Sequence, residues 1–112
     1  MICGEIYWIE FPGGAGRAQA GRRPAIIVQD PAASTRLPTV LAVPLTTQQD
    51  AMRFPGTVLI QPDASNRLSR VSVALVFQLT AIDRRFLTTR IGELDPTTLN
   101  AILSALDEIT GR

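Results

Sequence analysis

Short segments rich in β-branched and aromatic residues recur along most of the chain, separated by turns that contain glycine or proline. They predict strands at residues 5–11, 24–29, 39–45, 57–60, 71–79 and 88–93. The clearest period-two pattern is at 71–79, where one face would carry Val71, Val73, Leu75, Phe77 and Leu79. Because no helix separates consecutive strands, we expect a small, mostly antiparallel β-barrel of five or six strands.

A single helix is expected at the C-terminal end. Asp95 can cap its first turn, Pro96 suits the first helical position, and Gly111 is a candidate C-cap. Its apolar stripe would consist of Leu99, Ile102, Leu103, Leu106 and Ile109. Loops or turns are predicted at residues 12–21, 32–37, 62–67 and 83–86. Pro44 should lie at an edge, a bulge or a strand end, since proline donates no ladder hydrogen bond.

The totals favour one globular domain covering residues 1–112. Of the 112 residues, 46% are hydrophobic and 19% are charged, which allows a core and disfavours disorder. We expect no transmembrane segment and no signal peptide, because no apolar run approaches about 18 residues and the N-terminus leads directly into a strand. The single cysteine, Cys3, fits a reducing cytoplasm.

The residue types restrict the possible chemistry. The chain contains no histidine, so the commonest general base and metal ligand is missing. With one cysteine as well, a structural zinc site is excluded, and no carboxylates have calcium-loop or paired-acid spacing. We therefore expect neither a metal nor a cofactor. A nucleotide-binding P-loop is also excluded, since the glycine-rich segment 12–21 lacks a Gly-Lys-Ser/Thr ending and precedes a strand.

Arg23 and Thr46 are the pair of greatest interest. Arg23 precedes the second predicted strand and Thr46 follows the third, so antiparallel neighbours would bring the two together. All 11 basic residues are arginine, whose planar fork suits phosphate. Taken singly, an arginine before a proline is more often a solvated loop residue, and Thr46 with Thr47 is more often a turn. Together beside Gly21 they could form a phosphate cradle.

Such a cradle could cleave RNA without a histidine. RNA supplies its own nucleophile, the 2′-hydroxyl, so the protein has to align it and stabilise the charged phosphorane. The pKa of arginine, above about 12, makes it a poor proton acceptor at neutral pH. We therefore expect Arg23 to stabilise charge first, while the leaving 5′-oxygen could take its proton from Arg23 or from water.

Several motifs occur in an order and spacing that resemble a known family. They are G-E-I-Y-W at residues 4–8, G-R-R-P-A-I-I-V at 21–28, V-P-L-T-T-Q at 43–48, F-P at 54–55 and F-Q-L-T-A-I-D at 77–83. This pattern is similar to the MazF/PemK-like toxins, the endoribonucleases or mRNA interferases of type II toxin–antitoxin modules. The G-x-R-P and P-x-T-T-Q blocks carry most of its specificity.

The resemblance implies an SH3-like β-barrel with a C-terminal helix, assembled as a homodimer. It implies metal-independent cleavage of single-stranded RNA to 2′,3′-cyclic phosphate and 5′-hydroxyl ends, with Arg23 and Thr46 as catalytic residues. The loop 12–22 would border the RNA groove. Candidate RNA-binding residues are Arg17, Gln19, Arg22, Thr47, Gln48 and Gln78. A cognate antitoxin would block the groove with an acidic segment, and DNA would be bound only through that antitoxin.

The chain departs from some relatives at Ala18, Arg22 and Thr80, where they carry glutamate, histidine or arginine. Arg22 adds positive charge beside the proposed site, and we expect it to strengthen phosphate binding. Two alternatives remain open on the same fold. One is a growth inhibitor that poisons a protein such as DNA gyrase without cleaving RNA, and the other is an RNA-binding barrel without catalysis. A net charge of +1 counts against the latter.

Overall fold

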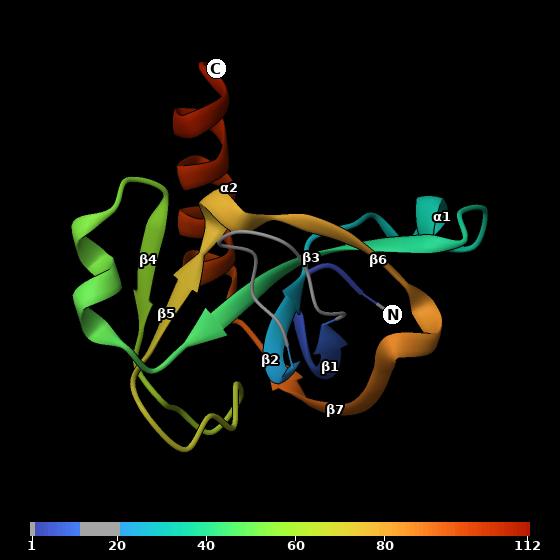
Figure 1. Ribbon diagram of the computed structural model, residues 1–112, viewed down its shortest axis with the longest axis horizontal. Coiled ribbons are helices and arrows are strands. Elements are labelled where there is room, and N and C mark those ends of the chain that lie inside the picture. The colour runs from blue at the N-terminus through green and yellow to red at the C-terminus, as the bar shows by residue number, and fades with distance from the viewer. Residues whose placement is uncertain (1, 12–20) are drawn as a thin grey trace.

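The computed structural model describes residues 2–11 and 21–112. Within them, seven strands form one sheet in the order β4-β5-β3-β2-β1-β7, with β6 also paired to β3 (Figure 1). The strands are β1 (Glu5–Phe11), β2 (Gly21–Ile27), β3 (Thr39–Thr46), β4 (Thr57–Ile60), β5 (Ser72–Leu75), β6 (Thr80–Asp83) and β7 (Leu87–Glu93). The helices are α1 (Pro31–Ser34) and α2 (Pro96–Thr110), with 3₁₀ turns η1 (Gln49–Arg53), η2 (Val76–Gln78) and η3 (Arg84–Phe86).

The predicted class, mostly antiparallel β with a C-terminal helix, is confirmed. Every strand pair in residues 2–11 and 21–112 is antiparallel, and α2 follows the last strand. The number of strands is seven rather than five or six. Among the described residues no pairing joins β4 to β7, so the curved sheet is open rather than closed.

Strand β3 is the long central strand that organises the sheet (Figure 1). It pairs with β2 on one side and, on the other, first with β6 and then with β5. Pro44 lies between the stretch paired with β6, which ends at Ala42, and the stretch paired with β5, which begins at Leu45. A residue without an N–H is tolerated there because the ladder is interrupted.

The predicted strand at 71–79 is wrong in its second half. Strand β5 ends at Leu75, η2 turns the chain at Val76–Gln78, and β6 begins at Thr80. Both faces of β5 are buried, so its alternation did not distinguish an inner from an outer face. Phe77 is exposed rather than inward-facing. The turn lets the chain pass from the β4–β5 hairpin to the other half of β3.

The predicted loop at 32–37 contains a second capped helical turn. The Asp30 carboxylate accepts a hydrogen bond from the Ala32 amide at 2.8 Å, and Pro31 occupies the first helical position of α1. This is the chemistry that correctly predicted α2, where Asp95 accepts from the Thr98 amide and Gly111 closes the helix with φ +84°. Of the described helices α2 is the longest, with 15 residues, and none is long and apolar enough to cross a membrane.

The core lies on both faces of the sheet, because successive strand residues point to opposite sides. One cluster joins Ile6, Ile26 and Val43 to Ile102 of α2, so the helix covers that face. The other joins Ile9, Ala25, Ile27, Val40, Ala42 and Ile82 on the opposite face of the sheet. The strands that carry the candidate site are therefore held by packing on both sides.

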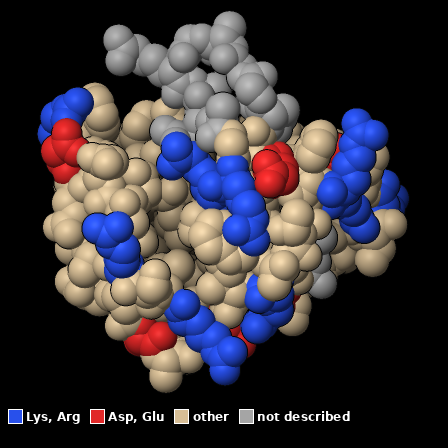
Figure 2. Space-filling model, turned by 60° about the horizontal axis from the view of Figure 1, so that its bottom comes forward, with Lys and Arg blue, Asp and Glu red and all other residues tan. Residues whose placement is uncertain are grey.

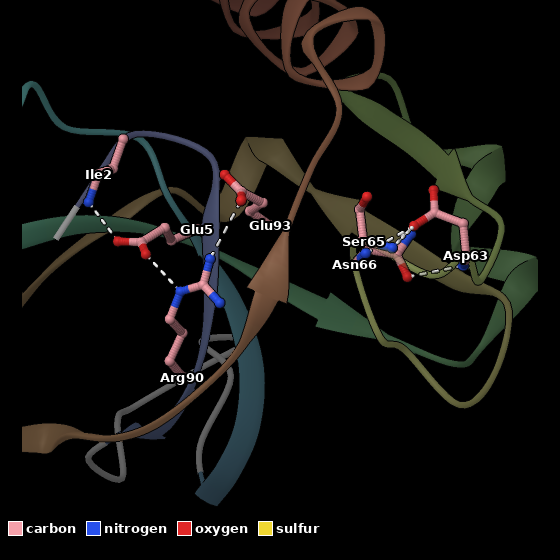
Figure 3. A network of polar contacts seen from close by, with 7 residues as sticks. All are labelled: Ile2, Glu5, Asp63, Ser65, Asn66, Arg90 and Glu93. Atoms are coloured by element: carbon pink, nitrogen blue, oxygen red, sulfur yellow. Dashed lines mark hydrogen bonds and ion pairs between the residues drawn. The ribbon is translucent and has the colours of Figure 1, made fainter.

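Polar contacts fix the sheet edge and the loop before β5 (Figure 3). The Glu5 carboxylate accepts hydrogen bonds from the Ile2 amide and from Nε of Arg90 in β7. In the loop, the buried Asn66 side chain accepts from the amides of Asp63 and Leu68 and donates to the Gln61 carbonyl. Gly92 of β7 packs so closely on this loop that an added Cβ would lie 2.4 Å from the Ser65 carbonyl oxygen.

Candidate active site

The start of β2 and the end of β3 lie side by side, as the sequence predicted. The register of β2 and β3 pairs Ala25 with Pro44 and Ile26 with Val43. Extending it by two residues places Arg23 opposite Thr46. Opposed residues in an antiparallel pair project to the same face of the sheet, so the two side chains share a face.

A cavity of about 300 Å³ opens where these two residues meet. The residues that line it are Arg22, Arg23, Pro24, Leu45, Thr46, Thr47, Gln48 and Ser72. Five of the predicted site residues, the pair Arg23 and Thr46 with Arg22, Thr47 and Gln48, are thus brought together. Their roles in RNA binding and cleavage stay predictions.

The backbone of Arg23 is fixed by strand pairing and by the proline that follows it. It is half-buried within β2, where it pairs with Ile9 of β1, and the following Pro24 restricts it to an extended conformation. A guanidinium on such a strand has a fixed origin, so little ordering is needed when an anion binds. The backbone of Arg23 therefore presents its guanidinium from a fixed point of the cavity wall.

Thr46 combines a turn with an accessible hydroxyl. Its Oγ1 accepts a hydrogen bond from the Gln48 amide at 3.2 Å, which starts the turn into η1. The alternative interpretation of Thr46 as a turn residue is therefore correct, but it does not exclude a functional role. With the oxygen accepting from an amide, the hydroxyl proton can be donated toward the cavity.

Ser72 was not predicted as a site residue. It is buried in β5, pairs with Ile60 of β4, and its hydroxyl donates to the Arg70 carbonyl at 3.1 Å. It lies at the cavity because Val73, its neighbour, pairs with Thr46. The sequence contained no local signal for this placement, which depends on the β3–β5 register.

Among the other predicted RNA-binding residues, Gln78 does not line the cavity. Gln78 lies in η2 rather than on a strand, at a point where the chain has already turned away from β5. Arg17 and Gln19 fall outside the described residues. Gln78 is thus placed differently from the sequence-based expectation, which assumed a continuous strand at 71–79.

Within the described part of the chain, the positive charge at the cavity comes from Arg22 and Arg23, which point to opposite faces of β2 because they are adjacent. The guanidinium of Arg22 lies over the Trp8 ring, 4.3 Å from its centroid. Basic side chains are spread over the face shown in Figure 2, with acidic side chains between some of them.

No group of three or more cysteine or carboxylate side chains within residues 2–11 and 21–112 is arranged to hold a metal ion. What the cavity does offer is two guanidinium groups, two threonine hydroxyls and the side-chain amide of Gln48 around a polar space. These donors match the oxygens of a phosphodiester. The arrangement can bind such a group and stabilise additional negative charge on it.

Comparisons with known proteins support the family that the sequence motifs resemble. Residues 2–110 match the family described as "PemK-like, MazF-like toxin of type II toxin-antitoxin system". The chain is 33% identical over 99 residues to endoribonuclease MazF6 of Mycobacterium tuberculosis, which covers 88% of this chain and 86% of that protein.

Solved structures agree on the fold. The crystal structure of MazF from Deinococcus radiodurans superposes with a TM-score of 0.84 at 25% identity, covering 100% of this chain and 97% of that one. A mycobacterial endoribonuclease in complex with its cognate antitoxin gives a TM-score of 0.77 at 25% identity, covering 99% and 95% of the two chains. With the family match over nearly its whole length, the chain belongs to the PemK-like, MazF-like toxins of type II toxin–antitoxin systems.

Proposed function

We propose that this chain is an endoribonuclease toxin that cleaves single-stranded RNA at the Arg23–Thr46 cavity. The observation that carries the proposal is the meeting of these two residues at one polar cavity, from strands that are fixed by packing on both faces. Similar proteins of the family are named endoribonucleases, which supports the same reaction here.

In the proposed reaction the RNA 2′-hydroxyl attacks its own 3′-phosphate. The O2′–P bond forms while the P–O5′ bond breaks, so the 2′-oxygen loses a proton and the 5′-oxygen gains one. The products are a 2′,3′-cyclic phosphate and a 5′-hydroxyl. Arg23 stabilises the extra negative charge of the phosphorane, and Thr46 donates a hydrogen bond to a phosphate oxygen. Water accepts the proton from the 2′-hydroxyl, and either Arg23 or water supplies the proton to the leaving 5′-oxygen.

The reaction is proposed to be metal-independent, because the substrate brings the nucleophile and a guanidinium stabilises the charge. The protein's main contribution is alignment of the 2′-oxygen with the leaving group. Thr47 and Gln48 are both exposed at the cavity, and we propose that they contact the RNA beside the scissile phosphate. Arg17, Gln19 and Gln78 stay candidate RNA-binding residues.

We also propose that a cognate antitoxin is the partner of this chain, as in the mycobacterial complex. An acidic antitoxin segment would compete with RNA for Arg22 and Arg23, and DNA would be reached only through the antitoxin. The toxin would act in the cytoplasm as a homodimer. An exposed aromatic pair, Phe54 and Phe77 with ring centroids 5.5 Å apart, favours a protein interface.

Incubation of the purified protein with a long single-stranded RNA in EDTA tests the nuclease. We expect discrete cuts with 2′,3′-cyclic phosphate and 5′-hydroxyl ends, and none with Arg23→Ala. Arg36→Ala, a substitution of an exposed arginine outside the cavity, is the matched control and should cut normally. Intact RNA from a folded protein that still arrests growth would overturn the proposal and favour a protein target such as gyrase.

A further inference from the structure

The neighbours of Arg22 indicate a role beyond attraction of phosphate. Arg22 and Trp8 lie on the same face of the β1–β2 ladder, since Arg22 pairs with Glu10 and Trp8 pairs with Pro24. The guanidinium carbon of Arg22 is 4.3 Å from the centroid of the indole ring. The tryptophan therefore supports the guanidinium in one position over its ring.

This pair adjoins the proposed site of cleavage. Pro24, the ladder partner of Trp8, lines the cavity together with Arg22 and Arg23. Arg22 is exposed, whereas Trp8 is half-buried. The indole is thus anchored in the sheet, and the guanidinium covering it is open to solvent beside the cavity. Because Arg22 and Arg23 line the same cavity, a nucleotide bound at Arg23 would lie beside Arg22.

A nearby carboxylate weakens the attraction of Arg22 for phosphate. Glu10 lies directly opposite it in the ladder and shares its face, so an acidic residue reduces the local positive charge. What distinguishes Arg22 is its flat guanidinium, supported on an aromatic ring. Proteins that read single-stranded RNA stack unpaired bases on aromatic rings and on arginine planes.

We propose that Trp8 and Arg22 form a base-stacking subsite, in which one unpaired base next to the scissile phosphate stacks on the Arg22 guanidinium and Trp8 supports it from beneath. This inference rests on the proposed function, because it names how the same cavity holds its RNA. The subsite holds the substrate in register for cleavage and gives the enzyme a contact with a base rather than with the backbone.

The test uses short RNAs that contain the mapped cut site. Each carries a 2′-deoxy sugar at the scissile nucleotide to block cleavage, and a single abasic nucleotide placed in turn at each flanking position. Binding is measured by fluorescence anisotropy. For the wild-type protein we expect one flanking position at which removal of the base weakens binding about fivefold or more.

Arg22→Lys keeps the charge but removes the plane, so it separates stacking from phosphate binding. We expect this variant to bind the intact RNA about as weakly as the wild type binds the abasic RNA that lacks the stacked base. On that abasic RNA, the affinity of the variant should fall no further. The salt dependence of its binding should match the wild type, because the number of charges is unchanged. Trp8→Leu should weaken binding in the same direction, provided that its circular dichroism is native.

Arg85→Lys is the matched control. The Arg85 guanidinium also lies over an aromatic ring, that of Phe86, at 5.2 Å. It follows β6, whose Asp83 pairs with Thr39 at the opposite end of β3 from Thr46, about 20 Å along the strand. This variant should retain the wild-type affinity and the wild-type abasic penalty.

The outcomes separate the two proposals. If the wild type cuts RNA but Arg22→Lys shows the same abasic penalty as the wild type, Arg22 does not stack on the base and the subsite is rejected, while the nuclease stands. If the wild type cuts but no flanking abasic nucleotide weakens its binding, the subsite is likewise rejected. If the folded wild type cuts no RNA, the proposed function fails, and the subsite is rejected with it.

Discussion

Replacement of Glu5 by glutamine should destabilise the protein in a pH-dependent way. The Glu5 side chain is 9% exposed and accepts hydrogen bonds from Arg90 and from the Ile2 amide, tying β1 to β7 (Figure 3). Burial opposes its ionisation. The hydrogen bonds from Arg90 and Ile2, together with the nearby positive charges, outweigh burial and hold the pKa of the Glu5 carboxyl below its ordinary value.

The size of the effect follows from these contacts. Hydrogen bonds to a charged group contribute about 1.5–3 kcal/mol when they are well shielded from water. Arg90 is 44% exposed and Ile2 is also exposed, so solvent screening reduces that range. We therefore expect Glu5→Gln to lower the free energy of unfolding at pH 7 by about 1–2 kcal/mol.

The dependence on pH has a definite sign. A group with a lowered folded-state pKa stabilises the fold above its unfolded pKa, which is about 4.3 for glutamate, and that stabilisation is lost as the pH falls through the folded pKa. The difference between wild type and Glu5→Gln should thus be constant above about pH 5.5 and shrink below pH 4.

Urea unfolding followed by the emission of Trp8, the single tryptophan, measures this difference at each pH. Glu93→Gln is the matched control, since Glu93 also lies near Arg90, at 3.5 Å, but is 57% exposed. Its midpoint should stay close to that of the wild type. A Glu5→Gln difference that stays the same from pH 7 to pH 3, or that grows in acid, would refute the account of the Glu5 contacts.

Two further substitutions test the packing that supports the site. Gly92→Ala would place its Cβ 2.4 Å from the Ser65 carbonyl oxygen and 2.6 Å from that of Asn66, and should lower the free energy of unfolding by about 1–3 kcal/mol in urea titrations; an unchanged midpoint would contradict the close contact. The Asp95 carboxylate accepts a hydrogen bond from the Thr98 amide, and hydrogen bonding with Thr98 lowers the pKa of Asp95. Asp95→Ala removes the cap, so it should lower the melting temperature at pH 7, and less so below about pH 4. An effect of equal size at both pH values would contradict the capping role.

Local chemistry predicted much of the fold. Asp95, Pro96 and Gly111 predicted both ends of α2, and β-branched runs predicted β1 and β4 with their bounds. Prediction was wrong where both faces of a strand are buried. In β5 every residue is buried, so alternating apolar residues did not show that the strand ends at Leu75.

The candidate site was predictable only in part. Antiparallel pairing of consecutive strands was enough to bring Arg23 beside Thr46, because both lie at the adjoining ends of β2 and β3. Ser72 and the stacking of Arg22 on Trp8 depend on registers between β3 and β5 and between β1 and β2. Those registers are set by packing across the whole sheet, so no local motif could have given them.

The most direct measurement of the central claim is the rate of RNA cleavage by the Arg23–Thr46 site under single-turnover conditions. With enzyme in excess over an RNA that contains the mapped cut site, in EDTA, we expect Arg23→Ala to slow cleavage by about 100-fold or more, as loss of a donor to a charged transition state does. Thr46→Val, which keeps the shape of the side chain, should slow it less severely but clearly. Cleavage by folded Arg23→Ala at the wild-type rate would contradict the claim.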